Sequence, residues 1–292
     1  MIDQPLDDIL EHRALAASAS ELRWTMPSKK LISLGRAQEP RRDELFYDAD
    51  DALGDGDIER ARTRYNLARE LLKAHLTVAP GDINALGDLA IFLEREAEAE
   101  ADLGSLSAAL DRHGEAQRLW LQLADADPKR ADDYRWWYAE SLARAAFIRG
   151  EGFDLAEDAC LRIRGLDDFD HARLAQLEWA QGRFEATRER LVQHQSSIEA
   201  LLDLAAVEID LGEELDAAGH LHAAQRLLSG TREGATPNVR SFVKLLELRL
   251  EPNQSSAREA GKRKLEALLG APGPDRVLVA RYQRWLGLPL GI

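Results

Sequence analysis

The chain has 292 residues, of which 45% are hydrophobic, a formal net charge of −14 and a single cysteine. The hydrophobic content excludes a wholly disordered chain, the acidic charge disfavours nucleic acid as a partner, and one cysteine excludes an intrachain disulfide and a cysteine-based metal site. Ala, Leu, Glu and Arg are abundant while Val, Ile and Thr are scarce, so we expect an all-α protein.

The first segment, residues 1–40, is predicted to form N-terminal capping helices that are interrupted at "TMPSKK". Its beginning is acidic and lacks a continuous apolar core, unlike a secretory signal. No stretch of the chain approaches the roughly 20 apolar residues of a membrane-spanning helix. We therefore expect a cytoplasmic protein without a membrane partner.

Two of the next stretches, residues 52–82 and 102–130, align with each other as helix-length segments that end near a proline. The matched positions are Ala68 and Ala116, Leu72 and Trp120, and Pro80 and Pro128. Small residues allow two helices to approach, large apolar residues fill the space between them, and proline ends a helix. A period of about 50 residues indicates stacked helical pairs.

Two later stretches carry the clearest repeat pattern. They are "LAQLEWAQGRFEATRERL", residues 174–191, and "LLDLAAVEIDLGEELDAAGHLHAAQRLL", residues 201–228. Gly182 and Gly212 mark a turn between two helices in each stretch, and Ala217 and Ala224 are small packing positions.

On these residues the chain resembles a tetratricopeptide repeat protein. The resemblance covers residues 41–250 and implies a right-handed α-α superhelix, that is, a solenoid of stacked helix pairs. The first two units are longer than the roughly 34 residues of that family, and they resemble repeats of large bacterial signalling and conflict proteins. Residues 251–292 are predicted to form C-terminal capping helices.

Sequence motifs of catalysis are absent from the chain. It contains no phosphate-binding loop, dinucleotide fingerprint, HExxH motif or GxSxG motif. The histidines lack the spacing of metal ligands, and Cys160 is expected to be a buried structural thiol. We therefore expect no catalytic residue, no metal site and no cofactor.

The acidic alternation "EREAEAEAD", residues 94–102, places Glu94, Glu98 and Asp102 on one helix face. One hypothesis is a solvated extension of a long helix. The other is an acidic lip that meets a basic segment of a partner.

The stretch "YRWWY", residues 134–138, concentrates four aromatic residues. On a helix, Tyr134, Trp137 and Tyr138 share one arc and are predicted to be core, whereas Trp136 lies on the other side. Trp136 either faces a binding groove or packs against the extra length of the preceding unit.

The resemblance implies that the first helix of each pair lines a concave groove. The candidate partner-binding residues in such a groove are Asn84, Asp88, Arg95, Arg135, Trp136, Glu140 and Arg144. The leading hypothesis is a non-enzymatic scaffold or adaptor that binds a partner protein or peptide there. The alternatives are a regulatory sensor of a peptide or small ligand, a helical enzyme, and a subunit of a bacterial signalling or defence complex. The sequence does not give the oligomeric state.

Overall fold

The structure, a computed structural model, describes residues 40–194, 197–230, 237–270 and 275–290. Thirteen α-helices contain most of these residues, and no strand occurs among them. The all-α fold is therefore confirmed. The predicted N-terminal capping helices, residues 1–40, lie outside the described residues except for Pro40.

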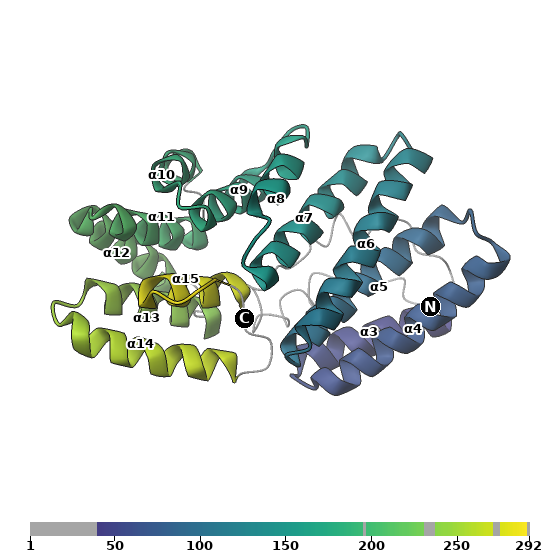
Figure 1. Cartoon of the computed structure of the whole chain (residues 1–292), viewed down its shortest axis with the longest axis horizontal. Helices are drawn as coiled ribbons and strands as arrows, with labels where there is room; N and C mark the ends of the chain where they lie inside the picture. The colour runs from purple at the N-terminus through teal and green to yellow at the C-terminus, as the bar shows by residue number, and fades with distance from the viewer. Residues whose placement is uncertain (1–39, 195–196, 231–236, 271–274, 291–292) are drawn as a thin grey trace. The chain divides into compact units, whose positions relative to one another are not determined.

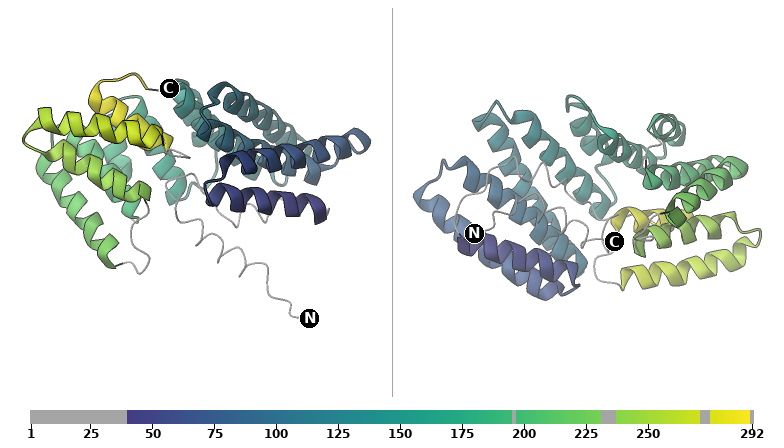
Figure 2. Two further views of the ribbon diagram at one scale, coloured as in Figure 1. Left: turned by 90° about the horizontal axis from the view of Figure 1, so that it is seen from below. Right: turned by 180° about the vertical axis from the view of Figure 1, so that it is seen from behind.

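The helices follow one another along the chain with short connections (Figure 1). They are α3 (Pro40–Gly54), α4 (Ile58–Val78), α5 (Ile83–Asp102), α6 (Leu106–Ala126), α7 (Ala131–Arg149), α8 (Phe153–Leu161), α9 (Asp168–Ala180), α10 (Phe184–Gln193), α11 (Ile198–Leu211), α12 (Glu214–Gly230), α13 (Pro237–Leu250), α14 (Gln254–Leu269) and α15 (Arg276–Leu286). Short connections force neighbouring helices to run antiparallel, and Figure 2 shows this for α3 and α4 and for α5 and α6.

The chain forms two compact units, residues 1–141 and 142–292. The boundary falls inside α7, immediately after Ser141. The predicted division into repeats at 41–250 and caps at 251–292 stays a prediction.

In the first unit, helix ends coincide with the capping and stop signals of the sequence. The side chain of Asp57 accepts a hydrogen bond from the amide of Arg60 at the start of α4. Asp82 does the same for two amides at the start of α5. Such caps satisfy amides that lack a partner within the helix. Pro80 and Pro128 each follow the end of a helix by two residues, as predicted.

The core of the first unit confirms the alignment of the two stretches. Ala68 and Ala116 are fully buried, and so are Leu72 and Trp120. Equivalent positions therefore hold equivalent packing roles in α4 and α6.

The aromatic residues of α7 extend this core. The ring of Trp120 stacks on Trp137 with centroids 5.6 Å apart and lies 6.3 Å from the ring of Tyr134. Tyr134 and Trp137 are buried, as predicted, whereas Tyr138 is only half-buried.

The second unit contains three regular pairs, namely α9 with α10, α11 with α12, and α13 with α14. Gly182 and Gly212 have positive φ values of 79° and 82° at the predicted turns, a backbone region that glycine enters at little cost. Ala217 and Ala224 are fully buried. The predicted helical repeat is confirmed here, because the first helices α9, α11 and α13 also contact each other in order.

Candidate functional site

The seven predicted partner-binding residues differ in exposure. Asn84 and Arg135 are exposed, as expected, and Arg135 donates a hydrogen bond of 3.0 Å to Asp132. The expectation of exposure is wrong for the others that were placed at a groove surface: Asp88, Trp136, Glu140 and Arg144 are buried and Arg95 is half-buried. Arg144 also belongs to the second unit, whereas the other six belong to the first.

The side chain of Trp136 is packed in the core and does not face a groove. Its ring meets the ring of Trp137 edge to face at 4.8 Å, and only 2% of the residue is exposed. Burying a large aromatic surface is favourable by several kcal/mol, of the order of 25 cal/mol per Å². The hypothesis of packing describes Trp136 better than the hypothesis of a solvent-facing anchor.

Arg95 belongs to a polar cluster between α3, α4 and α5. Its guanidinium donates a hydrogen bond of 2.9 Å to Glu98 and lies 3.9 Å from Asp50. The hydroxyl of Tyr65 donates to the same Asp50 carboxylate. Burial raises the pKa of Asp50, while the Arg95 charge and the Tyr65 hydrogen bond oppose this rise. The cluster therefore ties three helices together.

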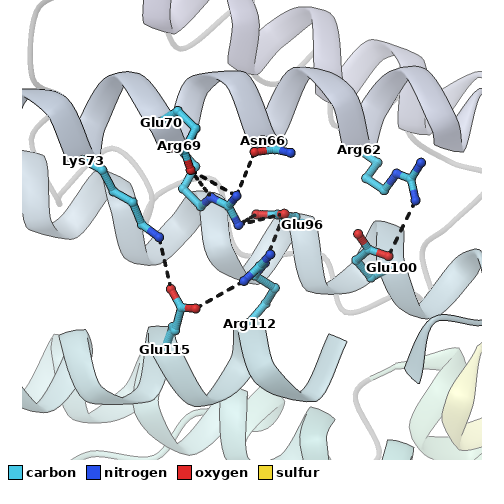
Figure 3. A network of polar contacts seen from close by, with 9 residues as sticks. All are labelled: Arg62, Asn66, Arg69, Glu70, Lys73, Glu96, Glu100, Arg112 and Glu115. Carbon is cyan, nitrogen blue, oxygen red and sulfur yellow. Dashed lines mark hydrogen bonds and ion pairs between the residues drawn. The ribbon is translucent and has the colours of Figure 1, made fainter. Parts of the chain in front are cut away.

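The acidic alternation of α5 is neither a solvated face nor a lip for a partner segment. Glu96 is buried and accepts two hydrogen bonds, of 3.0 and 2.9 Å, from Arg69 of α4. Arg112 of α6 approaches the same carboxylate at 3.1 Å. Figure 3 shows Glu96 between these two arginines. Burial raises the pKa of Glu96, and both guanidinium charges oppose the rise.

The same network continues at both sides of Glu96 (Figure 3). Glu115 lies 3.2 Å from Arg112 and 3.5 Å from Lys73. Both hypotheses for residues 94–102 are thus corrected, because the basic partners of these glutamates come from the chain itself. The partners of Glu94, Glu96 and Glu100 lie on α4 and α6, and Glu98 pairs with Arg95 of α5. The buried pair of Arg69 and Glu96, together with the more exposed pairs around it, connects α4, α5 and α6.

A buried histidine, serine and glutamate also meet in the first unit, and the sequence did not suggest them. His113 Nδ1 lies 2.9 Å from Glu94 and 3.3 Å from the hydroxyl of Ser141. In a hydrolytic triad the serine and the carboxylate occupy opposite nitrogens of the ring. Here both approach Nδ1, and all three residues are buried. This geometry connects α5, α6 and α7, and it is not that of a nucleophile with its base.

The second unit places helix α15 against α13 and α14, and the arginines of α15 reach α9 and α11 (Figure 1). We call the surface formed by Trp179 of α9, Asp203 and Asp210 of α11, and Phe242 of α13 the inner face. Every residue of α15 from 277 to 283 is buried. A helix that is buried all round is enclosed by other elements.

Arg281 is the deepest polar residue of α15. Its Nη2 donates a hydrogen bond of 2.5 Å to the carboxylate of Asp203. Its guanidinium carbon lies 4.7 Å from the ring centroid of Trp179 and 4.8 Å from that of Phe242. The cation therefore has a carboxylate partner and two aromatic faces, a combination that suits a planar guanidinium.

Arg284 engages the C-terminal end of α9. Its two terminal nitrogens donate hydrogen bonds of 2.6 Å each to the carbonyl oxygens of Trp179 and Ala180. The last carbonyls of a helix lack partners within the helix and carry its negative dipole end. Arg284 also lies over the Trp179 ring at 4.4 Å. Two arginines of α15 thus recognise the inner face and the end of α9 together.

Trp179 and Asp210 also make contacts that do not involve α15. The indole nitrogen of Trp179 donates a hydrogen bond of 2.8 Å to Asp210. Arg249 of α13 donates to the other oxygen of the same carboxylate. These bonds hold the ring on which both arginines of α15 stack, which preorganises the inner face for a guanidinium.

On its other side α15 approaches α14 closely. A Cβ atom added to Gly261 of α14 would lie 2.2 Å from the ring of Trp285. Only glycine leaves room for that ring, although glycine costs helix stability. Gly261 therefore serves the packing of α15 and not the helix that contains it.

The N-terminus of α15 begins at Asp275, which is buried and accepts a hydrogen bond of 2.9 Å from the amide of Leu278. Burial raises the pKa of Asp275 to about 6, although the amide bonds and Arg281 oppose the rise and Asp203 adds to it. A carboxyl whose pKa is raised by folding stabilises the folded state at low pH. That contribution is lost as the pH rises through about 6.

We predict that Asp275→Asn is more stable than the wild type at pH 8, by about 2–3 kcal/mol. Asparagine keeps an acceptor for the amide of Leu278 but cannot ionise. The difference shrinks as the pH falls from 7 towards 4, because the wild-type carboxyl becomes protonated in the folded state. Urea unfolding of both proteins at pH 8, 6 and 4.5 measures this. A stability difference that is independent of pH would contradict a buried charge at this position.

The sequence did not reveal the inner face. Asp203, Arg281 and Arg284 were not among the predicted partner-binding residues. The segment "RVLVARYQRWL" places Leu278, Val279, Tyr282, Trp285 and Leu286 on one apolar stripe of a helix and its arginines on the other side. That pattern indicates an amphipathic helix, and it does not reveal that Arg281 is buried as well.

No family model and no curated protein matches the sequence. Among solved structures, the crystal structure of the apo form of RapI is similar to the chain, with a TM-score of 0.48 and 11% sequence identity. The similarity covers 98% of this chain and 87% of that chain. At this score and identity it supports no conclusion about partner or activity.

Neither a membrane-spanning helix nor a metal-binding cluster occurs among the described residues. None of the helices placed there is long and apolar enough to cross a membrane. Within the same residues, no three histidine, cysteine or acidic side chains gather in a way that could hold a metal ion. Cys160 is buried, as predicted.

Proposed function

We propose that the chain is a non-enzymatic, cytoplasmic scaffold or adaptor of the tetratricopeptide-like class, which binds a helical segment of a partner protein along the first helices of its pairs. The observation that supports this proposal most is the seat of α15 on the inner face. There, α15 packs on α13 and α14 through apolar burial, and its two arginines bind residues of α9 and α11. A groove that accepts an amphipathic helix in this way is a common mode of peptide recognition.

The charge of the chain agrees with a protein partner. With a net charge of −14, electrostatic attraction favours a basic segment and disfavours nucleic acid. The histidine, serine and glutamate of the first unit do not form a catalytic arrangement, and this supports a binding role over the hypothesis of a helical enzyme. Arg135 and Asn84 remain the exposed candidates for contacts to a partner in the first unit.

The experiment is affinity capture of the tagged full-length chain from its native source, with chemical crosslinking and mapping of the crosslinked residues. Arg135→Glu is compared with the control Arg118→Glu, which reverses an equally exposed charge on a second helix, α6. We expect a reproducible partner whose crosslinks concentrate on first helices. If a basic segment of that partner contacts the first unit beside Arg135, Arg135→Glu raises its yield, because an opposite charge replaces a like one, and Arg118→Glu leaves the yield unchanged. Absence of any partner, or crosslinks confined to second helices, would contradict the proposal.

A further inference from the structure

Helix α15 contacts the inner face as a bound ligand would. Arg281 and Arg284 are one helical turn apart, so both point to one side of α15. Their partners lie 78 to 105 residues earlier in the chain, on α11 and α9. The contacts therefore do not depend on chain proximity, and any helix with the same side chains could make them.

The seat of α15 also carries costs. Arg281 is buried, yet its Nε and Nη1 nitrogens have no hydrogen-bond partner. Unpartnered buried donors weaken an interaction. Asp275, at the start of the same helix, is a buried carboxyl whose pKa is raised, so it opposes docking at neutral pH. A helix from a partner need not contain the buried carboxyl of Asp275.

We propose that α15 is an internal ligand of the inner face, and that a partner helix with two arginines three residues apart, flanked by apolar residues, displaces it. This inference rests on the proposed function and names the chemistry of the partner. A second copy of the chain is the other possible source of such a helix. Charge disfavours it, because two chains of net charge −14 repel each other, whereas a basic helix is attracted.

Gly261 allows α15 to be loosened without any change to the inner face. The added methyl group of Gly261→Ala collides with the ring of Trp285 and pushes α15 away from α14. Gly219 of α12 is the matched control, since it is exposed, interior to a helix, and has no atom within 4 Å of an added Cβ. Both changes raise helix propensity equally.

The probe is a fluorescein-labelled peptide of residues 275–290 with Trp285→Ala, which has no ring to collide with the methyl group of Gly261→Ala. It is titrated into the full-length chain and followed by anisotropy. When α15 occupies the site in most molecules, an external peptide can bind only the fraction of molecules in which the site is open. Its apparent affinity is lowered in proportion to that fraction. We therefore expect the peptide to bind Gly261→Ala at least about tenfold more tightly than it binds the wild type or Gly219→Ala. A peptide that carries Met at positions 281 and 284 is expected not to bind any of them.

Equal affinity of the peptide for Gly261→Ala and the wild type would overturn the proposal, and so would equal binding of the methionine peptide. A concentration-dependent dimer of Gly261→Ala that excludes the peptide would assign the site to a second copy and overturn the partner assignment. Circular dichroism checks that the variant folds. Trp285→Ala, which removes the colliding ring instead, provides the same test if Gly261→Ala does not fold.

The two proposals fail in different ways. If the peptide binds Gly261→Ala but no partner is captured from the native source, the result supports α15 as an internal ligand and contradicts the scaffold function. If a partner is captured but the peptide does not bind, the result supports the scaffold function and contradicts the role of α15 as an internal ligand.

Discussion

Replacing Arg281 with methionine lowers the free energy of unfolding of the second unit by about 3–5 kcal/mol. Methionine matches the length of the side chain, so the loss comes mainly from the charge. Asp203 would remain buried without the guanidinium that now lies 2.5 Å from it. Removing one partner of a buried ion pair is costly because the other charge stays out of water. Urea unfolding of the full-length chain measures the loss.

The pH and a double variant test the cause of this loss. Burial already raises the pKa of Asp203, and Arg281 opposes that rise. Without Arg281 the pKa rises further, so the deficit of Arg281→Met shrinks as the pH is lowered. Arg281→Met combined with Asp203→Asn is expected to recover about 2 kcal/mol relative to Arg281→Met alone. A deficit below about 0.5 kcal/mol at pH 8 would show that the pair is not buried as described.

Replacing Trp136 with alanine lowers the free energy of unfolding of the first unit by about 3–5 kcal/mol. The side chain is 2% exposed and contacts Trp137 edge to face, so the substitution leaves a cavity beside the aromatic core. The melting temperature of the first unit falls by several degrees as a result. Thermal unfolding monitored by circular dichroism measures this fall.

The adjacent residue provides the control for Trp136. The Arg135 side chain is 51% exposed, and Arg135→Ala is expected to change stability by less than about 0.5 kcal/mol. If Trp136→Ala instead retains full stability and loses the captured partner, Trp136 is a solvent-facing binding residue. That result would contradict the buried position of its side chain. The pair of variants therefore separates a core residue from a partner contact at neighbouring positions of one helix.

Local signals explain the part of the fold that the sequence predicted. Pro80 marks the junction of α4 and α5, and Gly212 marks the turn between α11 and α12. Helical periodicity also predicted that Tyr134 and Trp137 are core. Each of these effects acts within a few residues, so a single sequence is enough to find it.

The same local rules failed for charged residues. Glu96 was expected on a solvated face or a lip, because a carboxylate is usually exposed. Its burial depends on Arg69, which lies 27 residues earlier in the chain. Periodicity predicts the face of a helix on which a residue lies, but it does not give the residues that the face will meet.

The sequence by itself determined that this protein is built of helices, that helices end or turn at Pro80, Pro128, Gly182 and Gly212, and which small and aromatic residues fill the space between paired helices. Only the tertiary structure decided that the glutamates of α5 are paired within the chain, and that α15 lies on the inner face. The physical reason is the separation in sequence of the residues that interact. Caps, turns and periodicity are set by neighbours in sequence, whereas Arg281 and Asp203 are 78 residues apart and meet only after the second unit has folded.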